Sequence, residues 1–169
     1  MIPPKLPDNE KRRQFEVNKY QLLDTIPESS YDNITALMAY ICDAPISLIT
    51  LLDKDRNFLK SHYGLPFNES PRAISFCGHA INSQDAITIV EDSRKDERFH
   101  DNSLVTEHQA IFYAGAPLTN SEGFKLGTLC VYDTKPRKLT KEQQNALIAM
   151  AQQVTSLFEQ RYYHNYFQE

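Results

Sequence analysis

The chain has 169 residues, with 18 Lys and Arg against 22 Asp and Glu, a formal net charge of −4, and 41% hydrophobic residues. This size suits one domain with its own core, and the near-even charge gives no electrostatic footprint for a nucleic-acid partner. The first residues lack the apolar segment of a secretory signal, and no apolar run approaches the roughly 20 residues of a membrane span. We therefore expect one cytoplasmic domain over residues 1–169, without a nucleic-acid or membrane partner.

Two helices are expected in the first quarter of the chain. Asp8 or Asn9 can cap a first helix, which ends before Pro27. Its apolar side is expected to carry Phe15, Tyr20, Leu22 and Leu23. A second helix opens at Ser29 or Ser30, and its apolar residues follow the i, i+3, i+4, i+7, i+8 pattern of one buried stripe. These residues are Ile34, Leu37, Met38, Ile41 and Cys42.

Five apolar or alternating runs predict strands, at residues 46–53, 58–63, 87–90, 111–118 and 126–133. The first run is apolar on both faces, which is typical of a central strand in a sheet that is covered on both sides. Two polar turns, residues 53–57 and Ser121-Glu122-Gly123, join neighbouring strands into hairpins. Gly115 and Gly127 leave space beside the sheet, where we expect a side chain or a ligand to approach.

The segments between the strands carry most of the polar and reactive groups. Residues 65–75 are expected to form an irregular loop, and residues 76–83 a short helix that carries Cys77 and His79. Residues 91–108 are highly charged, and they predict a loop with short helical turns that is anchored by Phe99, Leu104 and Val105. Loops of this kind on a rigid scaffold often hold binding groups.

The last expected element is a helix that opens at Thr140. Thr140 and Gln143 match a capping box, in which each side chain satisfies the other residue's free backbone N–H. Apolar residues then recur at helical spacing, at Leu147, Met150, Val154 and Leu157. Beyond them Phe158, Tyr162 and Tyr166 continue at i+4 and form a tail too aromatic to be left in water. We expect a second copy of the chain to cover this tail, giving a homodimer through the terminal helices.

A series of short motifs follows one another along the chain. They are Leu22-Leu23-Asp24-Thr25, Pro27-Glu28, Pro45-Ile46-Ser47-Leu48, Pro71-Arg72, Ser75-Phe76-Cys77, His79-Ala80-Ile81, Asp96, Arg98-Phe99, Phe112-Tyr113-Ala114-Gly115-Ala116-Pro117-Leu118, Leu126-Gly127-Thr128-Leu129-Cys130-Val131 and Pro136-Arg137. In this order they resemble the GAF domain family, of the bacterial type found ahead of histidine kinases and diguanylate cyclases. Two positions depart from the family pattern: Ile111 stands where similar sequences have Arg, and Ser103 follows Asn102 in place of Pro.

This resemblance, which runs from about residue 22 to residue 161, implies an α+β fold of the GAF type, similar to the profilin and PAS folds. A central antiparallel sheet of five to six strands has the terminal helices on one face and, on the other, a small-molecule pocket built from loops and short helices. In that arrangement residues 1–24 form the N-terminal helix, residues 25–137 the second helix, sheet and pocket, and residues 138–169 the C-terminal helix. The whole chain is then one GAF-like domain.

The candidate ligand-binding residues lie in the segments expected around that pocket. They are Ser75, Phe76, Cys77, His79, Asp92, Asp96, Arg98, Phe99, Phe112 and Tyr113. Since neighbouring strand residues point to opposite faces, only one of Phe112 and Tyr113 can face the pocket. The charged residues around Phe99, among them Asp101, form either a polar lid or an internal network of salt bridges. We expect Arg72, fixed after Pro71, to hold its loop to a carboxylate through two parallel hydrogen bonds.

Cys77 and His79 raise the alternative of thiol chemistry. Residues at i and i+2 of a helix point away from each other, so the structural expectation is that Cys77 packs while His79 bonds to a loop. Cys77, His79 and Cys130 lack any CxxC or HxxxH spacing, so no zinc site is expected. The three cysteines, Cys42, Cys77 and Cys130, are odd in number and widely spaced, so reduced thiols are expected. Bilin-binding GAF relatives have a Cys-His adjacency that Gly78 interrupts here.

The first functional hypothesis is a non-enzymatic sensor. A small molecule or a partner protein would bind above the sheet, shift residues 91–108 and change the packing of the terminal helices, and we expect the output to pass through a signalling partner or the dimer itself. One alternative is a thiol-based redox enzyme resembling the free methionine sulfoxide reductases, which needs an exposed cysteine of low pKa. Another is a pure dimerisation module whose pocket is filled by its own aromatic side chains. The ligand, any cofactor and the effector stay open.

Overall fold

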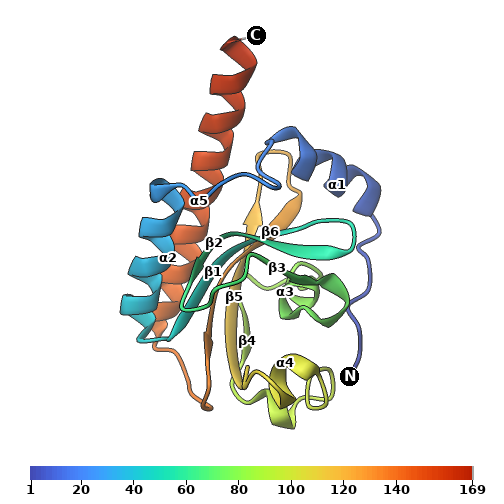
Figure 1. Cartoon of the computed structure of the whole chain (residues 1–169), viewed down its shortest axis with the longest axis vertical. Helices are drawn as coiled ribbons and strands as arrows, with labels where there is room; N and C mark the ends of the chain where they lie inside the picture. Colours follow the sequence, from blue (N-terminus) through green and yellow to red (C-terminus); the bar gives the residue numbers. More distant parts are fainter. Residues whose placement is uncertain (169) are drawn as a thin grey trace.

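The computed structural model describes residues 1–168, the side chain of residue 168 excepted. Within these residues the centre is an antiparallel sheet of six strands in the order β3-β2-β1-β6-β5-β4 (Figure 1). The strands are β1 (Ile46–Leu52), β2 (Arg56–Tyr63), β3 (Glu69–Pro71), β4 (Thr88–Val90), β5 (Phe112–Thr119) and β6 (Lys125–Asp133). The helices are α1 (Glu10–Lys19), α2 (Ser29–Cys42), α3 (Phe76–Ala80), α4 (Ser103–Thr106) and α5 (Lys141–Gln168), with short 3-10 turns η1 (Arg72–Ile74) and η2 (Ser93–Lys95).

The sheet is covered on both faces (Figure 1). Helices α2 and α5 lie on one face, over a large apolar core that includes Met38, Ile49, Phe112 and Leu147. The short helices and loops lie on the other, over a second core that includes Leu48, Phe76, Phe99 and Tyr113. Central strand β1 supplies alternate side chains to the two cores, which confirms the prediction of a twice-covered α+β sheet.

Two of the predicted apolar stripes are narrower in the structure. In α1 Arg13 and Val17 face the body of the domain, so Phe15, on the other side of the helix, is exposed and the expectation that it is buried is wrong. The helix also ends at Lys19, because the chain turns through positive φ angles at Gln21 (53°) and Asp24 (61°). In α2 the residues Ile34, Met38 and Cys42 are buried as predicted, whereas Leu37 and Ile41 are exposed at the edge of the stripe.

The short elements differ most from expectation. Residues 65–75, predicted as irregular, contain β3, which adds a strand by pairing three residues with β2. The short helix predicted for residues 76–83 ends at Ala80. The long strands match the predicted ranges closely, with β5 and β6 each shifted by one residue at the start.

Helix α5 begins with the predicted capping box. The backbone N–H of Gln143 donates to Thr140 Oγ1 at 3.1 Å, and the N–H of Thr140 donates to Gln143 Oε1 at 2.9 Å. From there the helix crosses the sheet, and its C-terminal part projects beyond the rest of the domain (Figure 1). Within residues 1–168, none of the helices combines the length and the apolar character needed to cross a bilayer.

Candidate functional site

Four aromatic rings fill the space above the sheet on the α3 side. Phe76 stacks on Phe99 with ring centroids 4.0 Å apart and an interplanar angle of 14°. Tyr113 and Tyr132 lie against Phe76 at 5.4 and 5.7 Å between centroids. All four side chains are buried. A cavity of about 70 Å³ next to Tyr132 is lined by residues that include Leu48, Leu59 and Leu104. It is far smaller than the roughly 300–1,000 Å³ of small-molecule pockets.

Gly115 explains how the Tyr113 ring lies along the sheet. Residues two apart in a strand share a face, and a Cβ at Gly115 would overlap the Tyr113 hydroxyl. The space expected beside Gly115 is thus taken by a side chain of the domain itself. At Gly127 the neighbour is the backbone of Thr50 on β1, because β1 and β6 pass close together there.

Cys77 lies beneath the aromatic cluster, among polar groups of the sheet. Its Sγ is 3.1 Å from Thr128 Oγ1, 3.5 Å from the Tyr113 hydroxyl and 3.9 Å from Cys130 Sγ. Both cysteines are fully buried. Burial acts to raise the pKa of the Cys77 thiol, but the hydrogen bonds from Cys130, Thr128 and Tyr113 outweigh it and lower that pKa to about 6.

His79 points away from Cys77, as helix geometry predicts. Its Nε2 donates to the carbonyl oxygen of Ile2 at 2.8 Å, and its ring meets the edge of Phe99 with centroids 5.0 Å apart. Burial lowers the pKa of His79 from its ordinary value of 6.5. The thiol and the imidazole therefore do not form a catalytic pair.

The charged loop of residues 91–108 forms an internal network of ion pairs. Arg94 pairs with Asp92 at 2.8 Å, and Arg98 pairs with Asp96 at 2.9 Å. The hydrogen bonds from these guanidinium groups hold the pKa values of both carboxyls below their ordinary range. The N-terminal amino group pairs with Asp101. Of the two alternatives for this loop, the structure shows the internal network.

Arg72 binds a carboxylate through two parallel hydrogen bonds, as predicted. Its guanidinium donates to the two carboxylate oxygens of Glu10 at 2.6 and 3.1 Å. Ser75, three residues on, caps α3 by accepting a hydrogen bond from the N–H of Gly78 at 3.0 Å. Arg72 and Ser75 therefore have structural partners.

The structure brings only some of the candidate residues together. Phe76, Cys77, Phe99 and Tyr113 form one buried cluster. Phe112 packs in the opposite core, beneath α2 and α5, because strand alternation places Tyr113 on the α3 side. The prediction that Phe112 is a ligand-binding residue is therefore corrected: it is a residue of the opposite core.

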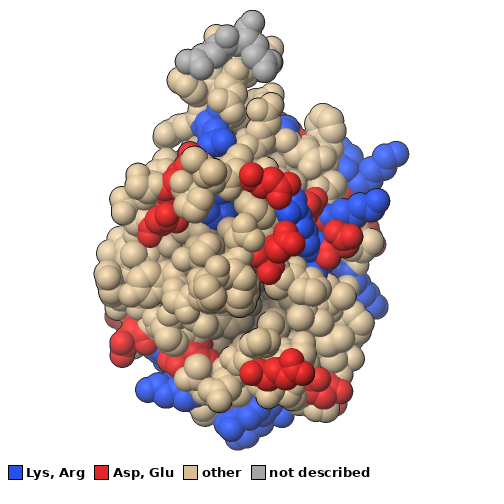
Figure 2. Space-filling model, viewed as in Figure 1, with Lys and Arg blue, Asp and Glu red and all other residues tan. Residues whose placement is uncertain are grey.

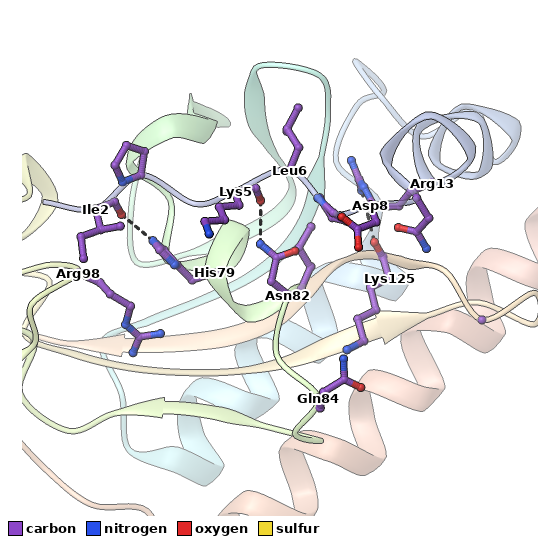
Figure 3. A pocket seen from close by; sticks show the side chains of 15 residues that line it. Ile2, Lys5, Leu6, Asp8, Arg13, His79, Asn82, Gln84, Arg98 and Lys125 are labelled. Atoms are coloured by element: carbon purple, nitrogen blue, oxygen red, sulfur yellow. Dashed lines mark hydrogen bonds between the residues drawn. The ribbon is translucent and has the colours of Figure 1, made fainter.

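An open groove of about 810 Å³ lies beneath the N-terminal segment, residues 1–9 (Figure 3). His79, Asn82, Arg98 and Lys125 line it, together with residues of the segment. The segment is held there by hydrogen bonds from Asn82 Nδ2 to the Lys5 carbonyl (2.7 Å), from the Ile2 N–H to the Arg98 carbonyl (3.0 Å), and from His79. Sequence reasoning found two of these residues, His79 and Arg98. It missed the groove, because nothing in residues 1–9 indicates where they lie.

Comparison with known proteins identifies the fold family. The family model for the GAF domain matches residues 27–157. The chain belongs to the GAF domain family. Over 149 residues it is 37% identical to a cyclic di-GMP phosphodiesterase of Pseudomonas aeruginosa, and the match covers 88% of this chain but only 25% of that protein. The chain thus spans about a quarter of that relative.

Solved structures show the same fold. One is the GAF domain from Acinetobacter phosphoenolpyruvate-protein phosphotransferase, with a TM-score of 0.66 and 17% identity, covering 91% of this chain and 95% of that one. Another is a type II free methionine-R-sulfoxide reductase from Thermoplasma acidophilum, with a TM-score of 0.64 and 14% identity, covering 78% and 92%. At these identities the likeness concerns the fold alone.

Proposed function

We propose that this GAF domain is a non-catalytic regulatory module of a bacterial, cytoplasmic signalling protein, and that it works as a homodimer through the C-terminal part of α5. The observation that carries the proposal is the exposure of aromatic side chains on the projecting helix. Tyr163, Tyr166 and Phe167 are 54%, 60% and 79% exposed, whereas Phe158, earlier on the same helix, is fully buried. Large aromatic groups clustered in this way are typical of a surface that another molecule covers.

A second copy of the chain fits this surface. Tyr163, Tyr166 and Phe167 stand at i, i+3 and i+4, so they share one side of the helix. Residues 162–168 contain no Lys, Arg, Asp or Glu, so two identical surfaces meet without charge repulsion. On the face drawn in Figure 2, the coloured side chains of the projecting part of α5 are mostly uncharged. Two such helices side by side would bury the aromatic rings of both.

The input site of the module is proposed in the groove beneath residues 1–9. The aromatic cluster occupies the space next to the sheet, whereas the groove, at about 810 Å³, has the size of a small-molecule site. Arg98 and Lys125 border it from two separate segments. A ligand or partner at this place would contact both the N-terminal segment and the residues that follow α3.

The proposal of a non-catalytic role is supported by the burial of the thiols. A sulfoxide reductase needs a cysteine sulfur that its substrate can reach, and Cys42, Cys77 and Cys130 are all buried. The name of the Pseudomonas relative describes a protein of about four times the matched length. Its activity is therefore not assigned to this domain.

The dimer is tested by sedimentation and native mass spectrometry at several protein concentrations. Wild-type protein is expected to dimerise, and the triple variant Tyr163→Ser/Tyr166→Ser/Phe167→Ser to dissociate at least ~100-fold more readily, since aromatic anchors dominate such contacts. Phe15→Ser, which removes an exposed aromatic from α1, is the matched control and should dimerise like wild type. A monomeric wild type, or a triple variant as dimeric as wild type, would refute the proposal.

The groove is tested in the same spectra. A small molecule retained from expression would appear as extra mass. Lys125 lines the groove, so the Lys125→Ala variant is expected to lose that mass. Lys138 is exposed on the connection between β6 and α5, so the control variant Lys138→Ala is expected to keep it. Equal retention in the two variants would place the ligand elsewhere.

A further inference from the structure

Two thiols meet inside the domain, and the proposed dimer does not use them. Cys77 belongs to α3 and Cys130 to β6, 53 residues later, yet their Sγ atoms are 3.9 Å apart. Both lie in the core on the α3 side of the sheet. Cys42, the last residue of α2, lies in the other core, between the sheet and helices α2 and α5, where burial raises the pKa of its thiol to about 11. The chain thus holds one close pair of thiols and one cysteine in a separate core.

The surroundings of the pair are polar, which is unusual for buried cysteines. Thr128 and Tyr113 donate O–H hydrogen bonds to Cys77 Sγ, and Thr128 is itself linked to Thr50 on β1 at 3.0 Å between hydroxyl oxygens. Hydrogen bonds of this kind stabilise a thiolate. The balance is opposite at the partner: burial, and then the neighbouring Cys77, raise the pKa of Cys130 well above its ordinary value and outweigh the lowering by Thr128. One sulfur of the pair is therefore favoured as thiolate and the other as thiol.

We propose that Cys77 and Cys130 are a redox-responsive pair, which a small hydroperoxide such as hydrogen peroxide converts into a reversible disulfide between α3 and β6. The thiolate of Cys77 attacks one peroxide oxygen, the O–O bond breaks, and hydroxide leaves. Cys77 is then a sulfenic acid. The sulfur of Cys130 displaces the sulfenic oxygen, which leaves as water and takes the Cys130 proton. In total two thiols and one peroxide give one disulfide and two waters, and a dithiol reductant reverses the oxidation.

The fold allows the necessary movement. The two sulfurs must approach from 3.9 Å to about 2.05 Å, the length of a disulfide bond. Helix α3 has only five residues, so a small shift of this segment brings Cys77 toward the sheet. The residues that follow Cys77, His79 and Asn82, border the open groove beneath residues 1–9. Peroxide therefore reaches the thiols when α3 opens locally, and we expect the rate of oxidation to follow that opening.

The test is peroxide treatment of the native chain, followed by alkylation with N-ethylmaleimide and non-reducing peptide mapping. The expected product has lost two hydrogens, contains a Cys77–Cys130 linked peptide, and carries an alkylated Cys42 only after unfolding. Dithiothreitol should restore both thiols. Cys130→Ala should leave a sulfenic acid on Cys77 that dimedone traps, whereas Cys42→Ala should form the disulfide like wild type.

Two results would overturn the inference. One is native protein that yields no Cys77–Cys130 linked peptide after peroxide treatment, whether its thiols stay reduced or another form of oxidised Cys77 or Cys42 appears. The other is a linked peptide that forms only in urea, where the chain is unfolded. Because these comparisons use the wild-type chain, they decide the matter even where an alanine variant fails to fold. The outcome is also independent of the proposed dimer, which is measured by mass.

Discussion

Glu10 links α1, directly or through Arg13, to three parts of the chain that lie far from it in the sequence. Its carboxylate accepts hydrogen bonds from Arg13 at 2.8 and 2.9 Å as well as from Arg72 at 2.6 and 3.1 Å. Arg13 in turn donates to the carbonyl oxygens of Leu52 (2.6 Å) and Leu126 (3.2 Å). One carboxylate thus ties α1 to η1 and, through Arg13, to strands β1 and β6.

This arrangement predicts a pH-dependent contribution to stability. Burial opposes ionisation of Glu10, but hydrogen bonds from the two arginines outweigh it and lower the pKa from 4.5 to about 2. Because the folded state binds this proton less readily than the unfolded state, the stabilisation is complete above pH 4.5 and is lost as the pH falls toward 2. Glu10→Gln is therefore expected to lower the free energy of unfolding by roughly 2–3 kcal/mol at neutral pH.

Urea unfolding at a series of pH values measures this contribution. The variant Glu10→Gln should lose less stability than wild type between pH 4.5 and pH 2. Glu122→Gln, an exposed substitution in the turn between β5 and β6, is the control and should behave like wild type. The same acid-induced loss in all three proteins would show that Glu10 does not act in this way.

Gly115 is expected to determine the position of Tyr113. In Gly115→Ala the new methyl group would overlap the Tyr113 hydroxyl, which is fully buried and cannot simply move aside. Such overpacking costs roughly 1–3 kcal/mol, and the displaced ring should alter the near-ultraviolet circular dichroism. Gly123→Ala is the comparison: its position has φ +84° but no neighbour within 4 Å, so it should cost about 1 kcal/mol without a spectral change. An unchanged spectrum for Gly115→Ala would contradict this prediction.

Among the elements, α5 offers the clearest test of a local sequence signal. Thr140 supplies the capping oxygen for the N–H of Gln143, so Thr140→Ala is expected to lower the free energy of unfolding by about 1 kcal/mol. Thr140→Ser keeps an oxygen at the same place and should retain most of the stability. Urea denaturation compares the three proteins. If serine were as destabilising as alanine, the capping bond would not be the cause.

The regular elements were predictable because each carries a local sequence pattern. The stripe of α2, the two-faced pattern of β1 and the capping box of α5 are all properties of residues near one another in the sequence. Strand β3 was missed because three residues are too few to show a period, and they are held by pairing with β2. Phe15 was misplaced because periodicity names the apolar positions of a helix but not the side from which the sheet approaches.

The site was less predictable than the fold, because its contacts join residues that are far apart in the sequence. A carboxylate partner for Arg72 followed from the chemistry of Arg, but nothing local pointed to Glu10, 62 residues away. The proximity of Cys77 and Cys130 depends on the register of β6 and on where α3 lies over it. The filling of the expected pocket depends on how four rings from separate segments pack.

At the scale of the whole molecule, the two ends of the described chain differ in how they are attached. Residues 1–9 are bound to the side of the domain by hydrogen bonds with His79, Asn82 and Arg98. The C-terminal part of α5 projects beyond the rest of the domain (Figure 1). Arg161 still pairs with Glu28 at 3.0 Å and Tyr162 packs against Tyr20, whereas Tyr163, Tyr166 and Phe167 beyond them are exposed. Hydrogen exchange distinguishes these regions, because an unsupported helix end opens at low free energy, whereas a segment that is hydrogen-bonded to the domain opens less readily.

If the dimer forms through α5, raising the protein concentration should slow amide exchange at residues 163–168 by ~10-fold or more, and leave residues 1–9 unchanged. The triple variant Tyr163→Ser/Tyr166→Ser/Phe167→Ser should show the same fast exchange at every concentration. Helix α2 also exposes apolar side chains, at Leu37 and Tyr40. A dimer built on that surface would instead protect α2 and leave amide exchange at residues 163–168 fast. Protection that appears on α2 alone would therefore move the interface away from α5, because only a contact along the projecting helix can prevent its end from opening.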